Sequence, residues 1–265
     1  MTTRRHISFP CGADRLAGTL DGSTTAQSRE TGLLLVSGGN EIRSGAWAGQ
    51  AQLAARIAAE GYPVLRFDRR GCGDSEGFNG GFQTSGPDII AALTAFRREQ
   101  PQLGRVIGMG NCDAASALML ASGAGCDGLI LSNPWTFDNN SPEDSPPATV
   151  RSHYRNRLKD LGAIKRLFTG KVAIAPLLSS LVSAAKPVSA SGSLTQELAT
   201  GLARFKGRVR FLVAARDRTG QAFMARWDDD DGRIHVCPNA THSFVEPHAR
   251  EWLIANTLEE LRRLS

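Results

Sequence analysis

The sequence lacks any pair of cysteines in the C-x-x-C spacing. Its 265 residues contain five cysteines, an odd number, at positions 11, 72, 112, 126 and 237. This distribution argues against a disulfide framework and against a four-ligand zinc site. Because unpaired cysteines are typical of a reducing compartment, we expect a cytoplasmic protein. The sequence also has no recognisable nucleotide, flavin or metal motif, so we expect no cofactor and no metal.

Long apolar segments and dense basic runs are absent as well. The most apolar stretch, residues 172–185, is interrupted by Pro176 and by serines, and it is too short and too polar to span a bilayer. The charged first residues are not followed by an apolar region, so we expect no signal peptide. The net charge is +5, but basic residues run together only in pairs. We therefore expect no nucleic-acid partner and no stable membrane insertion, and the oligomeric state stays open.

The overall composition is ordinary for a globular protein, with 41% hydrophobic and 22% charged residues. Residues 6–20 have the pattern of an antiparallel hairpin, and short apolar runs then alternate with helical patterns. The predicted strands are 33–36, 64–67, 105–109, 129–131, 209–213 and 234–236, and the helices are 50–60, 87–98, 113–122, 221–227 and 246–264. Alternation of this kind predicts an α/β fold, with a mostly parallel central sheet covered by helices on both faces.

Residues 134–205 interrupt the alternation with prolines, serines and a basic cluster. We predict that residues 1–133 and 206–265 form the core and that 134–205 form a helical cap or lid inserted over the carboxyl ends of the strands, where open α/β sheets bind their ligands. Residues 176–182 are expected to pack as part of this lid. The alternative for them is association with a membrane surface.

A strand-to-helix junction surrounds Cys112. A G-x-S-x-G motif at such a junction forms a nucleophile elbow, a sharp turn that presents its central side chain above the sheet. Here Cys112 replaces the serine, and Gly110 and Ala114 occupy the positions that require small residues. The helix N-terminus favours a thiolate, whereas the charge of Asp113 opposes it, so the net effect is open. The alternative is that Cys112 is a small buried side chain, as free cysteines often are.

A nucleophile at this position needs a base and an acid that orients the base, in the chain order nucleophile, acid, histidine. Asp217 and His242 follow predicted strands and share the sheet edge with Cys112. We predict that His242 moves the proton and that Asp217 holds the imidazole. Taken singly, Asp217 could be a helix cap and His242 a surface residue. His248 is the main rival for the role of the base.

The oxyanion of an acyl-transfer intermediate needs backbone N–H donors. The candidates are the amide of Asp113, directly after the nucleophile, and that of Gly39, in the glycine-rich loop after the first parallel strand. The alternative for this loop is an ordinary glycine turn. Just beyond it, Asn40, Glu41 and Arg43 are candidate substrate-binding residues. In that role Arg43 would bind a substrate carboxylate or phosphate and Glu41 would lie near the thiol, whereas the alternative is an ion pair that braces the loop.

Residues 68–77, which read Asp-Arg-Arg-Gly-Cys-Gly-Asp-Ser-Glu-Gly, resemble the D-x-R-G-x-G-x-S segment of many α/β-hydrolases. More narrowly, residues 37–45, 110–116 and 133–135 resemble the exosortase A system-associated hydrolases of type one. That family accompanies a bacterial exopolysaccharide and protein-sorting system. The cysteine nucleophile is similar to that of dienelactone hydrolases, which use a Cys–Asp–His triad. The resemblance implies the α/β-hydrolase fold and does not supply a natural substrate.

Together the residues predict an acyl hydrolase that cleaves a small-molecule ester, thioester or lactone through an acyl-enzyme on Cys112. Two alternatives remain open. An alcohol or amine acceptor would make the protein an acyltransferase, and a loss of efficient chemistry would make it an accessory or binding protein on the same scaffold.

Overall fold

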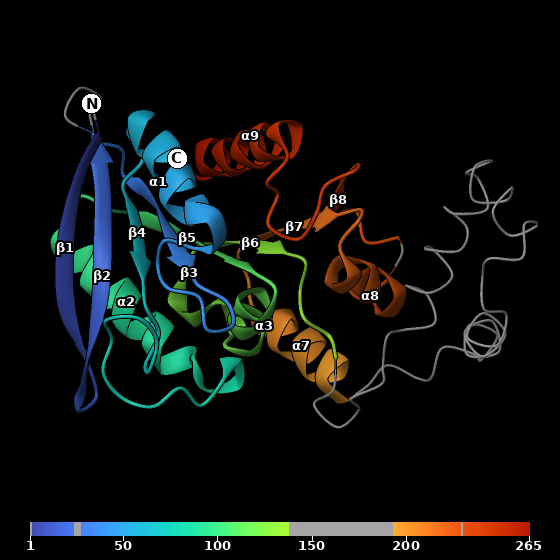
Figure 1. Cartoon of the computed structure of the whole chain (residues 1–265), viewed down its shortest axis with the longest axis horizontal. Coiled ribbons are helices and arrows are strands. Elements are labelled where there is room, and N and C mark those ends of the chain that lie inside the picture. The colour runs from blue at the N-terminus through green and yellow to red at the C-terminus, as the bar shows by residue number, and fades with distance from the viewer. Residues whose placement is uncertain (1, 24–27, 138–192, 229) are drawn as a thin grey trace, which may run out of the picture.

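A computed structural model describes residues 2–23, 28–137, 193–228 and 230–265. Its described residues form one eight-stranded sheet in the order β1-β2-β4-β3-β5-β6-β7-β8 (Figure 1). The first two strands, β1 (Thr2–Cys11) and β2 (Asp14–Ser23), form the predicted antiparallel hairpin. β2 also pairs antiparallel with β4, and from β4 onward the neighbouring strands are parallel. The predicted mostly parallel sheet is therefore confirmed.

The parallel strands are short, and all except the edge strand β8 are largely buried. They are β3 (Thr31–Val36), β4 (Val64–Phe67), β5 (Arg105–Asn111), β6 (Gly128–Ser132), β7 (Arg208–Ala214) and β8 (Ile234–Cys237). In β3, Leu33 and Leu35 pack into one core cluster and Leu34 and Val36 into another. Successive side chains of a strand point to opposite faces, so an unbroken apolar run indicates a strand covered on both sides.

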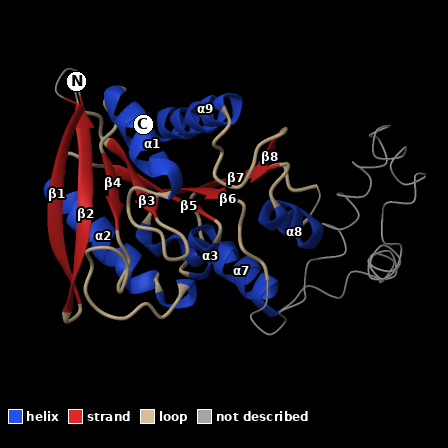
Figure 2. Ribbon diagram, viewed as in Figure 1, coloured by secondary structure: helices blue, strands red, loops and turns tan. Residues whose placement is uncertain are grey.

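Helices cover both faces of the sheet (Figures 1 and 2). On one face lie α1 (Gly49–Ala59) and α9 (Pro247–Leu264). On the other lie α2 (Gly86–Glu99), α3 (Asp113–Leu120), α7 (Ser193–Arg204) and α8 (Arg218–Arg226). Short 3-10 helices occur at Ala46–Ala48, Phe82–Thr84 and Ser122–Gly125. The predicted helices are thus present, although α8 begins at Arg218, earlier than 221, because the side chain of Asp217 caps it.

Most of the predicted cap, residues 138–192, lies outside the described residues, and so does the segment 176–182. The described end of the predicted insertion is α7, whose Leu194, Leu198 and Leu202 are buried in the same cluster as Leu118 of α3. α7 therefore packs as part of the helical layer beneath the sheet. Among the helices that the structure describes, none is long and apolar enough to cross a membrane.

Candidate active site

Cys112 lies in the sharp turn between β5 and α3. Its backbone is left-handed, with φ 60° and ψ −125°, a conformation that non-glycine residues rarely adopt. A Cβ on Gly110 would come within 2.6 Å of the carbonyl carbon of Ala114, so the turn closes only with glycine at that position. Ala114 is fully buried and leaves no room for a larger side chain. The pattern of small residues thus has a steric cause, and the turn presents a half-buried thiol at the carboxyl edge of the sheet.

The structure brings the three predicted catalytic side chains together. His242 Nδ1 lies 3.0 Å from Asp217 Oδ2, and the side chain of Cys112 is close enough to raise the pKa of the same ring. Asp217 Oδ2 accepts a further hydrogen bond, of 2.9 Å, from Gly220 N at the start of α8. Asp217 is therefore both the helix cap and the partner of the imidazole. The rival histidine, His248, is instead 3.0 Å from the carbonyl oxygen of Pro238.

The charges around His242 favour its protonated form. The hydrogen bond to Asp217, followed by that to Cys112, raises the pKa of His242 to about 10, although burial acts in the opposite direction. An imidazolium held at this place stabilises negative charge on the neighbouring sulfur. The site therefore has the electrostatic arrangement of a cysteine–histidine pair.

The remaining four cysteines differ from Cys112 because all four are buried. Burial is the main cause that raises the pKa of each of these thiols, and it raises the pKa of Cys126 to about 12. Since the thiolate is the reactive form, a thiol-directed reagent at neutral pH should report on Cys112.

Two asparagines that the sequence reading did not select hold the histidine loop. Asn133 Nδ2 donates to His242 O at 3.2 Å and to Asn111 Oδ1 at 3.0 Å. Asn111 Nδ2 donates to the same carbonyl oxygen of His242 at 3.3 Å. Asn133 Oδ1 accepts from Ala214 N at 2.8 Å. These bonds connect the ends of β5, β6 and β7 to the loop that carries His242.

Asn133 is fully buried and has a left-handed backbone, with φ 42°. Asparagine tolerates this conformation better than most residues, and its amide supplies both a donor and an acceptor. A sequence signal for the pair does exist. Asn111 ends one buried parallel strand and Asn133 directly follows the next, so both lie at the edge where Cys112 lies.

The amide of Gly39, a predicted oxyanion donor, already has an acceptor. Gly39 N donates to Asp113 Oδ1 at 2.6 Å. Asp113 Oδ2 is in turn 3.5 Å from Arg69 Nη2, and this nitrogen donates to Gly39 O at 2.5 Å. The guanidinium of Arg69 is buried and so holds the glycine loop and the carboxylate together. The loop therefore carries the expected N–H group, but the Asp113 carboxylate occupies it.

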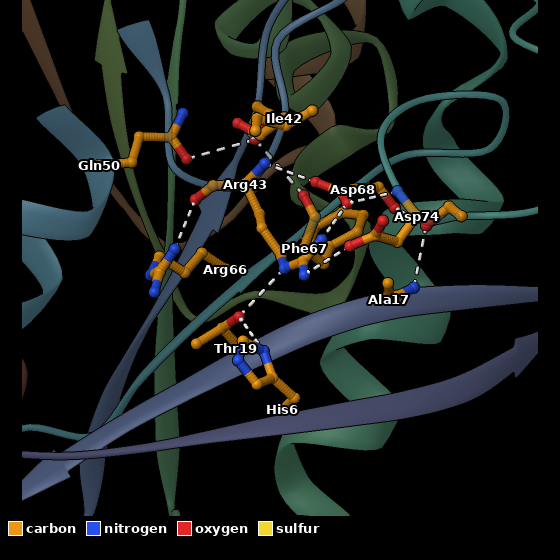
Figure 3. Close-up of polar contacts among 12 residues, drawn as sticks. His6, Ala17, Thr19, Ile42, Arg43, Gln50, Arg66, Phe67, Asp68 and Asp74 are labelled. Atoms are coloured by element: carbon orange, nitrogen blue, oxygen red, sulfur yellow. Dashed lines mark hydrogen bonds and ion pairs between the residues drawn. The ribbon is translucent and has the colours of Figure 1, made fainter. Parts of the chain in front are cut away.

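Arg43 braces its loop through ion pairs, which is the alternative to substrate binding. Its partners are Asp68 and Asp74, and Glu41 is not among them. Its guanidinium is ion-paired with the fully buried carboxylate of Asp68 and with Asp74 at 2.8 Å, and it donates to Thr19 Oγ1 at 3.1 Å (Figure 3). Arg66 Nη1 donates to Arg43 O at 3.0 Å. With its donors engaged in this way, Arg43 fastens the loop to the segment that resembles D-x-R-G-x-G-x-S.

The other two candidate substrate-binding residues are exposed. Asn40 Oδ1 accepts a hydrogen bond of 2.9 Å from Asn79 Nδ2, and Glu41 Oε2 accepts one of 3.4 Å from Ala46 N. Glu41 also lines a cavity of about 420 Å³ that the sequence did not predict. Within the described ranges, no group of three or more His, Cys, Asp or Glu side chains could hold a metal ion.

A family model described as "Alpha/beta hydrolase family" matches residues 33–255. No curated protein matches the sequence. Among solved structures, the chain is similar to the esterase Pf2001 of Pyrococcus furiosus, with a TM-score of 0.62, 16% identity, and coverage of 98% of this chain and 90% of that chain. It is also similar to proline iminopeptidase of Mycobacterium smegmatis, with a TM-score of 0.60, 16% identity and 98% coverage of both chains. These likenesses concern the fold.

The asparagine pair leads to a prediction. Asn133→Asp keeps the shape, the acceptor and the tolerance of a left-handed backbone, but it replaces two donors with a carboxylate oxygen that faces carbonyl oxygens. We expect it to lower the free energy of unfolding in urea by about 1–3 kcal/mol and to slow alkylation of Cys112, because His242 loses its anchor. Asn239→Asp is the matched control, since Asn239 is exposed and also left-handed, with φ 59°. Equal effects of the two substitutions would contradict the assignment.

A second prediction concerns pH. In Asp217→Asn the α8 cap is kept, because asparagine is a good N-cap, but the main cause of the raised His242 pKa is removed. The raised pKa contributes stability that is complete below the ordinary value of about 6.5. That contribution is lost as the pH rises through about 10. We therefore expect the stability deficit of the variant to be large at neutral pH and to shrink above pH 10.

The direct measurement is an NMR titration of the His242 ring, whose midpoint should fall in Asp217→Asn. His235 serves as the internal control, because burial and the charge of Arg210, and not Asp217, lower its pKa. An unchanged midpoint for His242 would mean that Asp217 does not set its charge state.

Proposed function

Because the chain belongs to the alpha/beta hydrolase family and is a hydrolase, we propose that it cleaves an ester, thioester or lactone of a small molecule through an acyl-enzyme on Cys112. One observation carries the proposal. His242 Nδ1 lies 3.0 Å from the carboxylate of Asp217, and the side chain of Cys112 is close enough to raise the pKa of the same imidazole. The protein of similar fold from Pyrococcus furiosus, Pf2001, is an esterase, which agrees with this substrate class.

In the first half of the reaction the Cys112 sulfur attacks the carbonyl carbon, and the carbonyl electron pair moves to oxygen. The tetrahedral intermediate then collapses, the bond to the leaving group breaks, and the imidazolium of His242 gives that group its proton. In the second half, His242 takes a proton from water as the water attacks the thioester. The acid is released, and the thiol is regenerated. Asp217 keeps the ring oriented in both halves.

The negative oxygen of each intermediate needs the backbone amides of Asp113 and Gly39. The Asp113 amide is at the first position of α3, where backbone N–H groups have no partner within the helix. The Gly39 amide becomes available when the Asp113 carboxylate turns away. Substrate binding in this proposal therefore includes the breaking of the contact between Gly39 N and Asp113 Oδ1.

The acceptor and the biological setting belong to the same proposal. If an alcohol or amine replaces water, the same acyl-enzyme gives acyl transfer. The resemblance of residues 37–45, 110–116 and 133–135 to the exosortase A system-associated hydrolases supports a link to a bacterial exopolysaccharide and exosortase system, without supplying the substrate. The five free cysteines support a cytoplasmic location.

A second candidate is a non-catalytic accessory or binding protein. The observation that favours it is the Asp113 carboxylate on the Gly39 amide, since a protein without turnover has no need to keep that donor open. Arg69 then serves to fix the closed arrangement.

Substitution of the nucleophile tests the chemistry. Wild-type protein is assayed with short- and long-chain acyl esters and thioesters, and mass spectrometry is used to detect an acyl adduct on Cys112. We expect Cys112→Ala to lose the adduct and to lower kcat/KM by about a thousandfold or more, because the covalent route is gone. Cys126→Ala is the control, since that thiol is buried in the core. Hydrolysis that survives in Cys112→Ala would reject the mechanism.

Substitution of Asp113 separates the two candidates. Asp113→Ala frees the Gly39 amide and leaves the backbone N–H of residue 113 in place. For a hydrolase we expect kcat/KM to rise by about tenfold, since a charged acceptor no longer competes with the developing oxyanion. Asp127→Ala, which breaks a 3.1 Å ion pair with Arg97 elsewhere, is the control. Absence of turnover in both the wild type and Asp113→Ala favours the accessory protein, and a fall in activity shows that the carboxylate assists catalysis.

A further inference from the structure

A cavity of about 420 Å³ is lined by residues of α1 and α9. These two helices lie on one face of the sheet (Figure 1). Its size falls within the range of about 300–1,000 Å³ that is usual for small-molecule sites. The floor is apolar and includes Leu35 and Met109 from the sheet, Leu53 from α1 and Ile254 from α9. Such a floor favours an apolar ligand body.

The charged groups of the cavity lie at its outer rim. Arg56 of α1 and Glu251 of α9 form an exposed ion pair of 3.0 Å there. Trp47, whose side chain is 82% exposed, also borders the cavity. The entrance of the cavity is therefore polar. Its apolar floor offers no charged side chain to an ionic group of a ligand.

One buried polar group in this wall has no partner. Ser132 lines the cavity at the end of β6, its side chain is 1% exposed, and its hydroxyl makes no hydrogen bond. An unsatisfied buried hydroxyl is costly, and each one in a folded protein needs an explanation. Less than 1 Å² of the hydroxyl oxygen is exposed, so a ligand oxygen in the cavity would satisfy it once the side chain turns toward the cavity.

The cavity reaches chain neighbours of the candidate catalytic residues, although neither Cys112 nor His242 lines it. It is lined by Asn111 and Ser243, which directly precede Cys112 and directly follow His242 in the chain. Ser132 is the register partner of Asn111 on the neighbouring strand, at a strand spacing of about 5 Å. Ser132 therefore lies beside the last residue of the strand that leads into the elbow.

From these observations we propose that the cavity holds the acyl chain of the substrate, and that the acyl group carries a hydroxyl or keto oxygen near its carbonyl that bonds to Ser132. The proposal rests on the acyl chemistry proposed above and names its substrate class, an oxygenated acyl group of medium length. The chain extends from the elbow along the apolar floor toward the mouth at Arg56 and Glu251.

The test measures binding without turnover. Calorimetry is carried out on the Cys112→Ala protein with methyl octanoate and with methyl hydroxyoctanoates whose hydroxyl is next to the carbonyl or one carbon further. We expect one hydroxy ester to bind about tenfold more tightly than methyl octanoate. The advantage should disappear in the additional variant Ser132→Ala, which should fold at least as stably because it removes an unsatisfied group.

Filling the cavity gives a second readout. Ala55, on α1, lines the cavity, whereas Ala59, one helical turn later, is exposed and does not. Ala55→Phe should weaken the binding of all these esters by about tenfold or more, and Ala59→Phe should leave it unchanged.

The outcomes separate the two proposals. Failure of every ester to bind, or binding that neither Ser132→Ala nor Ala55→Phe alters, overturns the assignment of the cavity. Equal binding of plain and hydroxylated esters, with weakening only in Ala55→Phe, overturns the role of Ser132. If the esters bind as expected but wild-type protein does not hydrolyse them, the acyl-enzyme chemistry fails and the cavity stands as a ligand site.

Discussion

The side-chain amide of Asn133 is bonded to segments that are far apart in the chain and that each carry part of the site. Through Asn111 it reaches the strand that ends in the elbow, through Ala214 N the strand that leads to Asp217, and through a carbonyl oxygen the loop of His242. Parallel strands alone bring these segments only to the same edge of a sheet. The amide fixes them at hydrogen-bonding distance, and the relation between sulfur, imidazole and carboxylate depends on it. Since it is buried and fully used, it cannot shift without loss of several bonds.

The loop on the other side of Cys112 is fixed by charges. Asp68, fully buried, holds Arg43, and the same carboxylate accepts a hydrogen bond from Asp74 N at 3.0 Å. Gly73, with φ 52°, passes so close to this carboxylate that a side chain there would collide with it. The D-x-R-G-x-G-x-S segment thus acts as a brace for the glycine loop. The loop that carries His242 is thus held by neutral amides, whereas the glycine-rich loop is held by ion pairs.

Local patterns explain what could be predicted from the sequence. Continuous apolar runs such as Leu33 to Val36 identify strands buried on both faces, and Gly110 with Ala114 identify a turn too tight for larger side chains. The positions of Asp217 and His242 after strands were enough to predict that they share an edge. The partners of Arg43, the acceptor on Gly39 N and the cavity could not be predicted, because each depends on side chains from distant segments whose contacts no local pattern encodes. The positions of Asn111 and Asn133 at the ends of neighbouring strands could have been predicted. Their role could not, because an amide at a strand end carries no catalytic signature of its own.

The contact between Gly39 and Asp113 also affects how binding would be measured. The carboxylate is an intramolecular ligand tethered next to the amide it occupies, and no dilution of the protein removes it. In the proposed reaction a substrate oxyanion would compete with the carboxylate for the same hydrogen, so the apparent dissociation constant would be the intrinsic one divided by the fraction of molecules in which the carboxylate has turned away. A transition-state analogue would therefore bind more weakly than its own contacts alone imply, by the factor that this fraction sets.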